Sequence, residues 1–227
     1  HRDLHSFPTR RSSDLRIISF SNNPYLQNSN LLGVLFDNIS NQVVIKLQYH
    51  TFTDKETREI CFHPYLLKQY NNRWYLIGAA DDDGKILNFA LDRIDSVTAL
   101  PEMKYKPCNE DLADRFEDII GVTLYEDRDI EHILFWVSNR SKDYVGTKPI
   151  HGSQCQYKNE KDEEFRRQYP SLNEGAFFSI DCIPNYELIR ELCSFGKDLL
   201  VMEPKSIQDD VFHHTQQMYE DYLGIRT

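Results

Sequence analysis

The first hundred residues change from a helical to a strand-like hydrophobic pattern. Apolar residues recur at helical spacing over residues 29–41, where Ser29 or Asn30 would be a good N-cap, and this predicts a short amphipathic helix. The pattern then alternates every second residue over residues 43–50, which is typical of a strand with one buried face. Further strands are predicted over 58–67, bent near Pro64, then over 73–80 and 86–91. One helix followed by four or five short antiparallel strands favours a small barrel or curled sheet.

The second half alternates between strand and helix patterns. Residues 101–107 hold two prolines and are interpreted as a linker, and Asn109 could cap a helix that runs to Ile120 and stops at Gly121. The remaining predicted elements are strands over 130–137, 176–183 and 199–202, a helix from Pro184 to Gly196, and a last helix capped by Ser206 and running through Leu223. This alternation predicts an α+β sandwich of the ferredoxin-like kind.

The N-terminal residues do not read as part of a natural protein. Residues 5–15, HSFPTRRSSDL, are what one reading frame of a common sequencing adapter encodes. We therefore interpret residues 1–15 as an artefact and exclude them from fold reasoning. The alternative is a disordered basic arm. If the adapter was joined at Arg16, the native chain is expected to continue upstream.

Composition limits the class of protein. An apolar fraction of 40% with 12% aromatic residues can supply hydrophobic cores. No apolar run approaches the roughly 18 residues of a membrane span, and residues 16–30 are too polar for a signal peptide. The five cysteines are odd in number and form no C-x-x-C pair, which suits reduced thiols and a cytoplasmic protein.

Charge is unevenly distributed along the chain. Residues 16–100 carry a net charge of −1, whereas residues 101–227 carry −10. An acidic body argues against general binding of duplex DNA, because such binding neutralises phosphates with Lys and Arg. A local basic pocket in the first half is still compatible with these numbers.

The segment HPYLLKQYNNRWYLIG, residues 63–78, is the most distinctive part of the sequence. In a strand Trp74 and Leu76 share one face while Tyr75 lies on the other. Two apolar residues facing inward with a phenol displayed outward could form the floor of a ligand site. They could equally form an ordinary hydrophobic strand, because aromatic residues are enriched in strands generally.

An ordered series of motifs resembles one known family. Trp74-Tyr75-Leu76, with the His63-Pro64 step, Gly78 and residues 89–94 (FALDRI), resembles the signature of WYL domains, sensor modules of bacterial transcription regulators. Residues 147–154 (TKPIHGSQ) and 183–188 (IPNYEL) resemble the C-terminal extension of WYL regulators of the Bacteroidetes-like form. The series covers about residues 16–225.

The resemblance implies an α+β fold in which a small Sm-like or SH3-like β-barrel is followed by a ferredoxin-like α+β domain. We expect the barrel with its helix over residues 16–100, a linker and helix over 101–129, and the C-terminal extension over 130–227. The family barrel senses a ligand, often thought to be nucleic acid or a nucleotide. A winged helix-turn-helix that binds DNA usually precedes it, and that domain is expected to be missing from this chain.

Family positions carried over to this sequence give the expected ligand site: Tyr49, His63, Tyr75, Asn88 and Arg93. Arg93 offers a planar fork of donors for phosphate, Tyr75 can stack on a base, and His63 adds a donor. Structural roles are open for the same residues: an ion pair for Arg93, and packing in the core for His63 and Tyr49. Many WYL domains have a basic residue where this chain has Leu87, which leaves Asn88 as a neutral substitute.

The sequence gives no sign of an enzyme, a cofactor or a metal site. It contains no P-loop, G-x-G-x-x-G, G-x-S-x-G or H-E-x-x-H motif, and His213 and His214 are adjacent rather than spaced for chelation. We therefore expect a regulatory sensor, acting as a homodimer, with an oligonucleotide or nucleotide effector. The alternative is a protein-interaction or dimerisation module with no small-ligand role.

Overall fold

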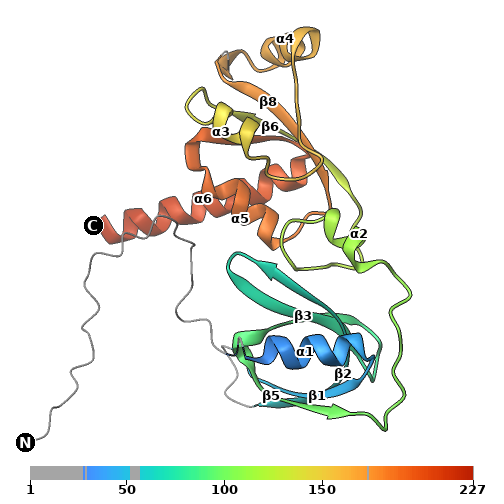
Figure 1. The fold of residues 1–227 in the computed structure, drawn as a ribbon. Helices are drawn as coiled ribbons and strands as arrows, with labels where there is room; N and C mark the ends of the chain where they lie inside the picture. Colours follow the sequence, from blue (N-terminus) through green and yellow to red (C-terminus); the bar gives the residue numbers. More distant parts are fainter. Residues whose placement is uncertain (1–27, 29, 52–56, 173, 227) are drawn as a thin grey trace, which may run out of the picture.

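Two antiparallel sheets, each with its own helices, follow one another along the chain (Figure 1). The computed structural model describes residues 28, 30–51, 57–172 and 174–226. The predicted artefact over residues 1–15 lies outside the described residues. Within them, no helix is both long enough and apolar enough to cross a membrane.

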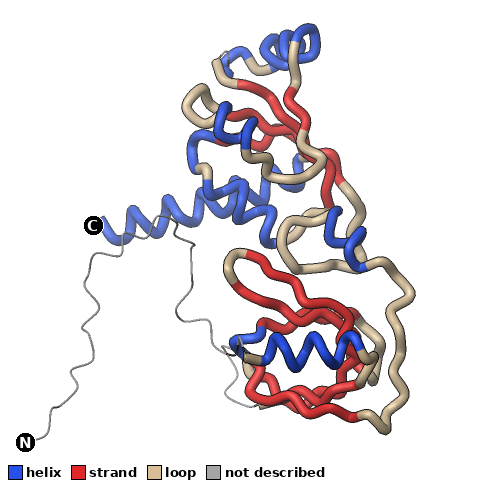
Figure 2. Tube along the Cα trace, viewed as in Figure 1, coloured by secondary structure: helices blue, strands red, loops and turns tan. Residues whose placement is uncertain are grey.

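The first sheet has five strands in the order β4-β3-β2-β1-β5. Its elements are α1 (Leu31–Ser40), β1 (Val44–Tyr49), β2 (Arg58–Tyr70), β3 (Arg73–Ala80), β4 (Ile86–Ala90), the 3-10 turn η1 (Leu91–Arg93) and β5 (Ile94–Leu100). The predicted helix and the four predicted strands are confirmed. The sheet curls around α1, which lies across its concave side (Figures 1 and 2).

The core of the first sheet follows directly from the alternation in β1. Ile45, Leu47 and Tyr49 point to the same side and pack with the buried Leu35 of α1. A fully buried leucine stabilises the folded state by roughly 1.5–3 kcal/mol relative to an exposed one. Helix α1, which has no side-chain N-cap hydrogen bond, is therefore held mainly by this packing.

Strand β3 divides its side chains as the alternation predicts. Leu76 is fully buried on the concave side, and Trp74 packs against the same cluster. Tyr75 lies on the other face, where it packs beside Ile77 and Phe116 of a second cluster. The phenol of Tyr75 is therefore half-buried under the second half of the chain rather than displayed on an open surface.

Strand β2 bends at Pro64, as the sequence predicts. The register with β3 shifts between Pro64 and Leu66, because proline has no N–H to donate to the ladder. Gly78 lies opposite Pro64, and a Cβ there would be 2.1 Å from the carbonyl oxygen of His63. The bend therefore requires glycine at position 78.

The edges of the first sheet are β4 and β5, joined by η1. No ladder pairs β4 with β5 within the described residues, so the expected closed Sm-like barrel is not confirmed. The broader prediction of an α+β fold built on antiparallel sheets is confirmed.

The segment between the sheets contains a shorter helix than expected. Helix α2 spans Leu112–Glu117 rather than continuing to Ile120. Its N-cap is Asp111, not Asn109, because the Asp111 carboxylate accepts a hydrogen bond of 2.9 Å from the backbone N–H of Ala113. Phe116 of α2 is buried against the convex face of the first sheet, with the ammonium of Lys68 lying 4.7 Å from its ring centroid.

The second sheet has four antiparallel strands in the order β7-β8-β6-β9. Its elements are β6 (Glu131–Val137), α3 (Lys142–Thr147), β7 (Cys155–Gln156), α4 (Asn159–Gln168), the 3-10 turn η2 (Pro170–Leu172), β8 (Ala176–Cys182), α5 (Tyr186–Ser194), the 3-10 turn η3 (Gly196–Asp198), β9 (Leu199–Glu203) and α6 (Lys205–Arg226). With α4 set aside, the unit reads βαββαβ with its first and third strands central, which is the predicted ferredoxin-like arrangement.

Two boundaries in this half differ from the prediction. Pro184 lies outside α5, and Asn185 is the N-cap, accepting a hydrogen bond of 2.9 Å from the N–H of Leu188. Helix α6 begins at Lys205, directly after Pro204, and extends three residues beyond the predicted end. Asn185 also donates to the carbonyl oxygens of Ile120 and Thr123, so it fixes α5 to the segment after α2.

Candidate functional site

Two of the five predicted site residues meet directly at one end of the first sheet. Tyr49 is the last residue of β1 and Arg93 the last of η1. The guanidinium carbon of Arg93 lies 5.2 Å from the centroid of the Tyr49 ring. This distance is within the range of a cation–π contact, which holds the planar guanidinium in a defined place.

The Tyr49 ring is buried beneath the Arg93 guanidinium and does not line the surface of the site. Its side chain is only 6% exposed, and its ring packs edge-on against Phe89 with centroids 4.7 Å apart. Burial raises the pKa of Tyr49 above its ordinary 10.0, while the nearby positive charge of Arg93 acts in the opposite direction. Tyr49 is therefore a neutral, buried platform, and Arg93, which is half-exposed, is the group that can reach a ligand.

Two further arginines are neighbours of residues in this site. Arg58 is directly opposite Tyr49 in the β1–β2 ladder and is exposed. Arg73 begins β3 and forms an ion pair with Asp92, with 3.1 Å between Nη2 and Oδ2. The other carboxylate oxygen of Asp92, Oδ1, is buried, and no described residue donates a hydrogen bond to it. Arg73 is therefore paired with the η1 turn through Asp92, and Arg58 lies beside Tyr49 in the ladder.

The turn that carries Arg93 is fastened to the chain ahead of α1. The side-chain amide of Asn28 donates hydrogen bonds of 3.2 Å to the carbonyl oxygen of Leu91 and 2.9 Å to that of Ile94. From the other side, the N–H of His50 donates to the carbonyl oxygen of Arg93 over 3.2 Å. These bonds hold both ends of η1.

Tyr75 lies close to this end but on the opposite face of the sheet. In the β3–β4 ladder it pairs with Ala90, the residue directly before η1. Its packing beside Phe116 leaves the phenol half-buried. Tyr75 can therefore contribute at the rim of the site, not as an open stacking surface.

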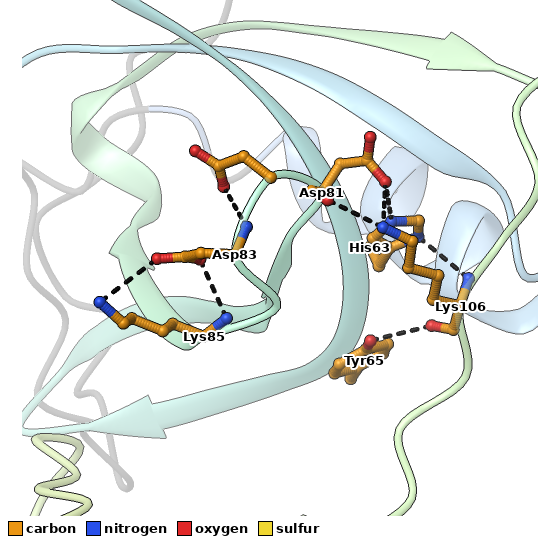
Figure 3. Close-up of polar contacts among 7 residues, drawn as sticks. His63, Tyr65, Asp81, Asp83, Lys85 and Lys106 are labelled. Carbon is orange, nitrogen blue, oxygen red and sulfur yellow. Dashed lines mark hydrogen bonds and ion pairs between the residues drawn. The ribbon is translucent and has the colours of Figure 1, made fainter.

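His63 lies elsewhere. It pairs with Ala79, four residues from Tyr75 along β3, which corresponds to roughly 13 Å of strand. Its side chain is fully buried, and both ring nitrogens have protein partners: Asp81 at Nε2 and the backbone N–H of Lys106 at Nδ1 (Figure 3). The structural role considered for His63 therefore describes its position better than ligand binding.

The network around His63 fixes the start of the linker to the sheet. The ammonium of Lys106 lies 2.7 Å from Oδ1 of Asp81, and the Tyr65 hydroxyl donates to the carbonyl oxygen of Lys106 (Figure 3). Hydrogen bonds from Lys106 and His63 hold the pKa of the Asp81 carboxyl below its ordinary 3.8. The Tyr105 hydroxyl donates to the carbonyl oxygen of Pro64 over 2.7 Å, and burial raises the pKa of Tyr105 to about 12.

Asn88 also has a structural partner. Its amide donates a hydrogen bond of 2.8 Å to the carbonyl oxygen of Val122, which joins β4 to the segment after α2. Both residues border a pocket of about 200 Å³ that Phe116 and Leu124 also line. Asn88 therefore connects the two halves of the chain, and it lies on β4 away from Arg93.

The C-terminal motifs noted in the sequence have structural roles as well. His151 bonds through Nε2 to the carbonyl oxygen of Glu117, at the end of α2, over 2.7 Å. Gln154 accepts from the N–H of Ile150 and donates to the carbonyl oxygen of Val145. These contacts explain the polar residues of the segment 147–154 without a ligand.

The guanidinium group of Arg93 gives the site a chemistry that suits an anion. Arginine donates several hydrogen bonds in one plane and matches phosphate geometry. In the described part of the chain, no group of three or more His, Cys, Asp or Glu side chains is arranged to hold a metal ion. The arrangement can therefore bind and orient a phosphate-bearing ligand through guanidinium groups.

The first half is a small α+β module: a curled five-stranded antiparallel sheet with one helix across it and an arginine held over a buried tyrosine. Residues 30–99 match the family model of the WYL domain, so this part of the chain, α1 to β5, is a WYL domain. The predicted WYL domain is confirmed over these residues. No curated protein sequence matches the chain.

Two solved structures resemble the chain at low sequence identity. One is proteasome accessory factor B/C (PafBC) of Arthrobacter aurescens, 12% identical, with a TM-score of 0.33 over 84% of this chain and 27% of that one. The other is a CRISPR Cas-related protein, 11% identical, with a TM-score of 0.48 over 84% of this chain and 50% of that one. The chain thus spans about a quarter and a half of these two proteins.

Sequence reasoning missed Asp81, Lys106 and Asp92. The first two are 18 and 43 residues from His63, so no local pattern joins them. A histidine before proline in a strand, followed by a cluster of aspartates at the next turn, is the one signal that could have suggested a buried pair. Asp92 stood within the recognised motif, but its partner Arg73 becomes visible only in the fold.

Proposed function

We propose that this chain is the sensing part of a transcription regulator and that it binds a nucleic-acid fragment or a nucleotide at the end of the WYL sheet. The observation that carries the proposal is the guanidinium of Arg93, held over the buried Tyr49 ring at 5.2 Å by a turn that is fastened at both ends. A preorganised guanidinium binds phosphate at a lower entropic cost than a free one.

The charge distribution supports a small or single-stranded effector. The WYL half is near neutral, with Arg93 in the η1 turn and Arg73 paired to Asp92 of that turn, whereas residues 101–227 carry a net charge of −10. The acidic half opposes a long duplex lying across the molecule. Recognition of operator DNA is assigned to a helix-turn-helix upstream of this chain, and the five free cysteines support a cytoplasmic setting.

Binding of a labelled single-stranded oligonucleotide, followed by fluorescence anisotropy at several salt concentrations, tests the site. Arg93→Ala should weaken binding about tenfold or more, because a charge-assisted hydrogen bond contributes about 1.5–3 kcal/mol. It should also flatten the dependence of affinity on salt. The matched control is Arg190→Ala, which removes the same charge from a guanidinium that lies 5.6 Å from the Tyr186 ring on α5.

Equal weakening by Arg93→Ala and Arg190→Ala would show nonspecific attraction and would contradict the assignment. Unchanged affinity in Arg93→Ala would contradict it as well. Mononucleotides added as competitors would then separate a nucleotide effector from a longer fragment.

The second candidate function is assembly. Helix α6 exposes large apolar side chains, including Phe212, Tyr219 and Tyr222, each at least 60% exposed. A surface of this kind favours a protein partner. It supports the proposal that the sensor works as a homodimer.

A further inference from the structure

Helix α6 leaves the body of the protein after its first two turns. Ile207 is buried against the second sheet and Val211 packs beside it, whereas residues 216–226 are all exposed. The free part projects away from both sheets (Figure 1). A helix end without tertiary contacts is only marginally stable in water, so burial of its apolar residues against a partner would stabilise it.

Four of the apolar residues of α6, together with Thr215, fall on one seam. Spacings of four, three, four and three separate its members: Val211, Thr215, Met218, Tyr222 and Ile225. This is the a/d pattern by which two helices pair, with Thr215 and Tyr222 at a and the others at d. Met218, Tyr222 and Ile225 are 55%, 60% and 80% exposed, so the seam is open over about two turns.

An apolar groove continues the seam at the root of the helix. It has a volume of about 650 Å³, and it lies between α6 and the edge strand β9. Leu200 and Met202 of β9, Phe212 and Met218 of α6, and Gln208 contribute to its walls. The groove can accept a second helix laid beside α6.

The flanks of the seam identify the partner as a second copy in the antiparallel direction. If two α6 helices pair so that Met218 faces Thr215 of the other copy, then Tyr222 faces Val211 and Ile225 reaches the groove at Gln208. On one flank His214 lies near Asp221 of the other copy, and on the other flank Phe212 lies near Tyr219. The helix is thus complementary to itself in charge and shape, which a two-fold interface requires.

We propose that α6 forms an antiparallel pair with α6 of a second copy, and that the free end of each helix fills the groove beside β9 of the other. The partner is this chain itself. The interface lies outside the Arg93 site, so the dimer can be tested independently of effector binding.

Sedimentation velocity of the full chain from 1 to 50 µM tests the interface. The wild type should be a dimer, and Met218→Glu should dissociate at least tenfold more readily, because the substitution places a charge in the seam of both copies. Leu223→Glu is the matched control: Leu223 is 47% exposed on the same helix but off the seam, and its variant should remain dimeric. Circular dichroism checks that each variant is folded.

Disulfide trapping tests the direction of pairing in a Cys155→Ser background. Phe212→Cys combined with Tyr219→Cys should form a covalent dimer, whereas neither single substitution should. Seven residues of helix separate the two positions by about 10 Å, too far for a bond within one chain or between identical positions of an antiparallel pair.

A monomeric wild type, a dimer that survives Met218→Glu, or equal dissociation by Leu223→Glu would overturn the interface. Trapping by either single variant, or no trapping by the double variant, would overturn the antiparallel register. Oligonucleotide binding measured on the same samples distinguishes failure of the α6 interface from failure of the Arg93 site. Arg93→Ala should remain dimeric, and Met218→Glu should still bind the oligonucleotide.

Discussion

The backbone N–H of Lys106 donates a hydrogen bond of 3.1 Å to Nδ1 of His63. Nδ1 must therefore be unprotonated, and the ring proton is on Nε2, where it is donated to Asp81. The imidazole thus joins the linker to the β3–β4 turn in its neutral tautomer. A fully buried histidine joins two segments that lie 25 residues apart in the sequence.

Replacing His63 should be costly. His63→Ala removes two hydrogen bonds and leaves a cavity, so we expect a loss of about 3 kcal/mol in the free energy of unfolding, measured by urea denaturation. The control is His132→Ala, which breaks another histidine–aspartate pair, that of His132 with Asp181, where both side chains are more than half exposed. That variant should lose less than about 1 kcal/mol. Similar losses in the two variants would contradict the structural role of His63.

Two glycines should respond to alanine in opposite directions. Gly78→Ala places a methyl group 2.1 Å from the His63 carbonyl oxygen and 2.6 Å from the Phe62 ring, so a loss of about 3 kcal/mol or more is expected. Gly33 is exposed within α1, and a methyl group there meets nothing within 4 Å. Gly33→Ala should therefore stabilise by roughly 0.5–1 kcal/mol. Thermal denaturation of both variants gives the comparison, and a well-tolerated Gly78→Ala would contradict the close approach of position 78 to the His63 carbonyl oxygen.

Alkaline pH should destabilise the protein through its buried acids. Burial raises the pKa of the Cys182 thiol from 9.0 to about 12. Between these values the unfolded chain loses a proton that the folded chain keeps, so the free energy of unfolding falls as pH rises, by up to about 1.4 kcal/mol per pH unit. Below pH 9 this contribution is fully present. Urea titrations from pH 8 to 11 should show a shallower decline in Cys182→Ala, and parallel declines would refute the shift.

Removing the carboxylate beside Arg93 should strengthen effector binding. Asp92 opposes an anionic ligand, so Asp92→Asn should tighten oligonucleotide binding roughly threefold, as expected for one charge acting over several ångströms through water. Asp83→Asn removes the same charge at the opposite end of β4, in the turn with Lys85, and should leave the affinity unchanged. Weaker binding by Asp92→Asn would mean that the ion pair with Arg73 is needed to shape the site.

Elements with strong periodicity could be predicted from the sequence. The predicted strands over residues 43–50 and 73–80 match β1 and β3 closely: β1 buries one face along most of its length, and β3 is buried on both faces from Leu76 to Ala80. The sequence of α4 carries no comparable pattern, because Phe165 is its one buried residue and supplies no apolar stripe. Strand β7 has only two residues, too few for a period. Both depend on the second sheet for their conformation.

The candidate site was predicted in part. The contact between Tyr49 and Arg93 joins residues that the family resemblance had selected, 44 positions apart. His63 and Asn88 came from the same resemblance, yet tertiary hydrogen bonds to Lys106 and Val122 determine their positions. Periodicity gives the face on which a residue lies, but not which distant backbone group satisfies it.

Asn28 gives the Arg93 turn a mechanical connection. Its side-chain amide, just ahead of α1, donates hydrogen bonds to the carbonyl oxygens of Leu91 and Ile94, which lie on either side of Arg93 in the sequence. Tension on the chain ahead of α1 therefore acts on the ends of that turn without having to pass through the hydrophobic core.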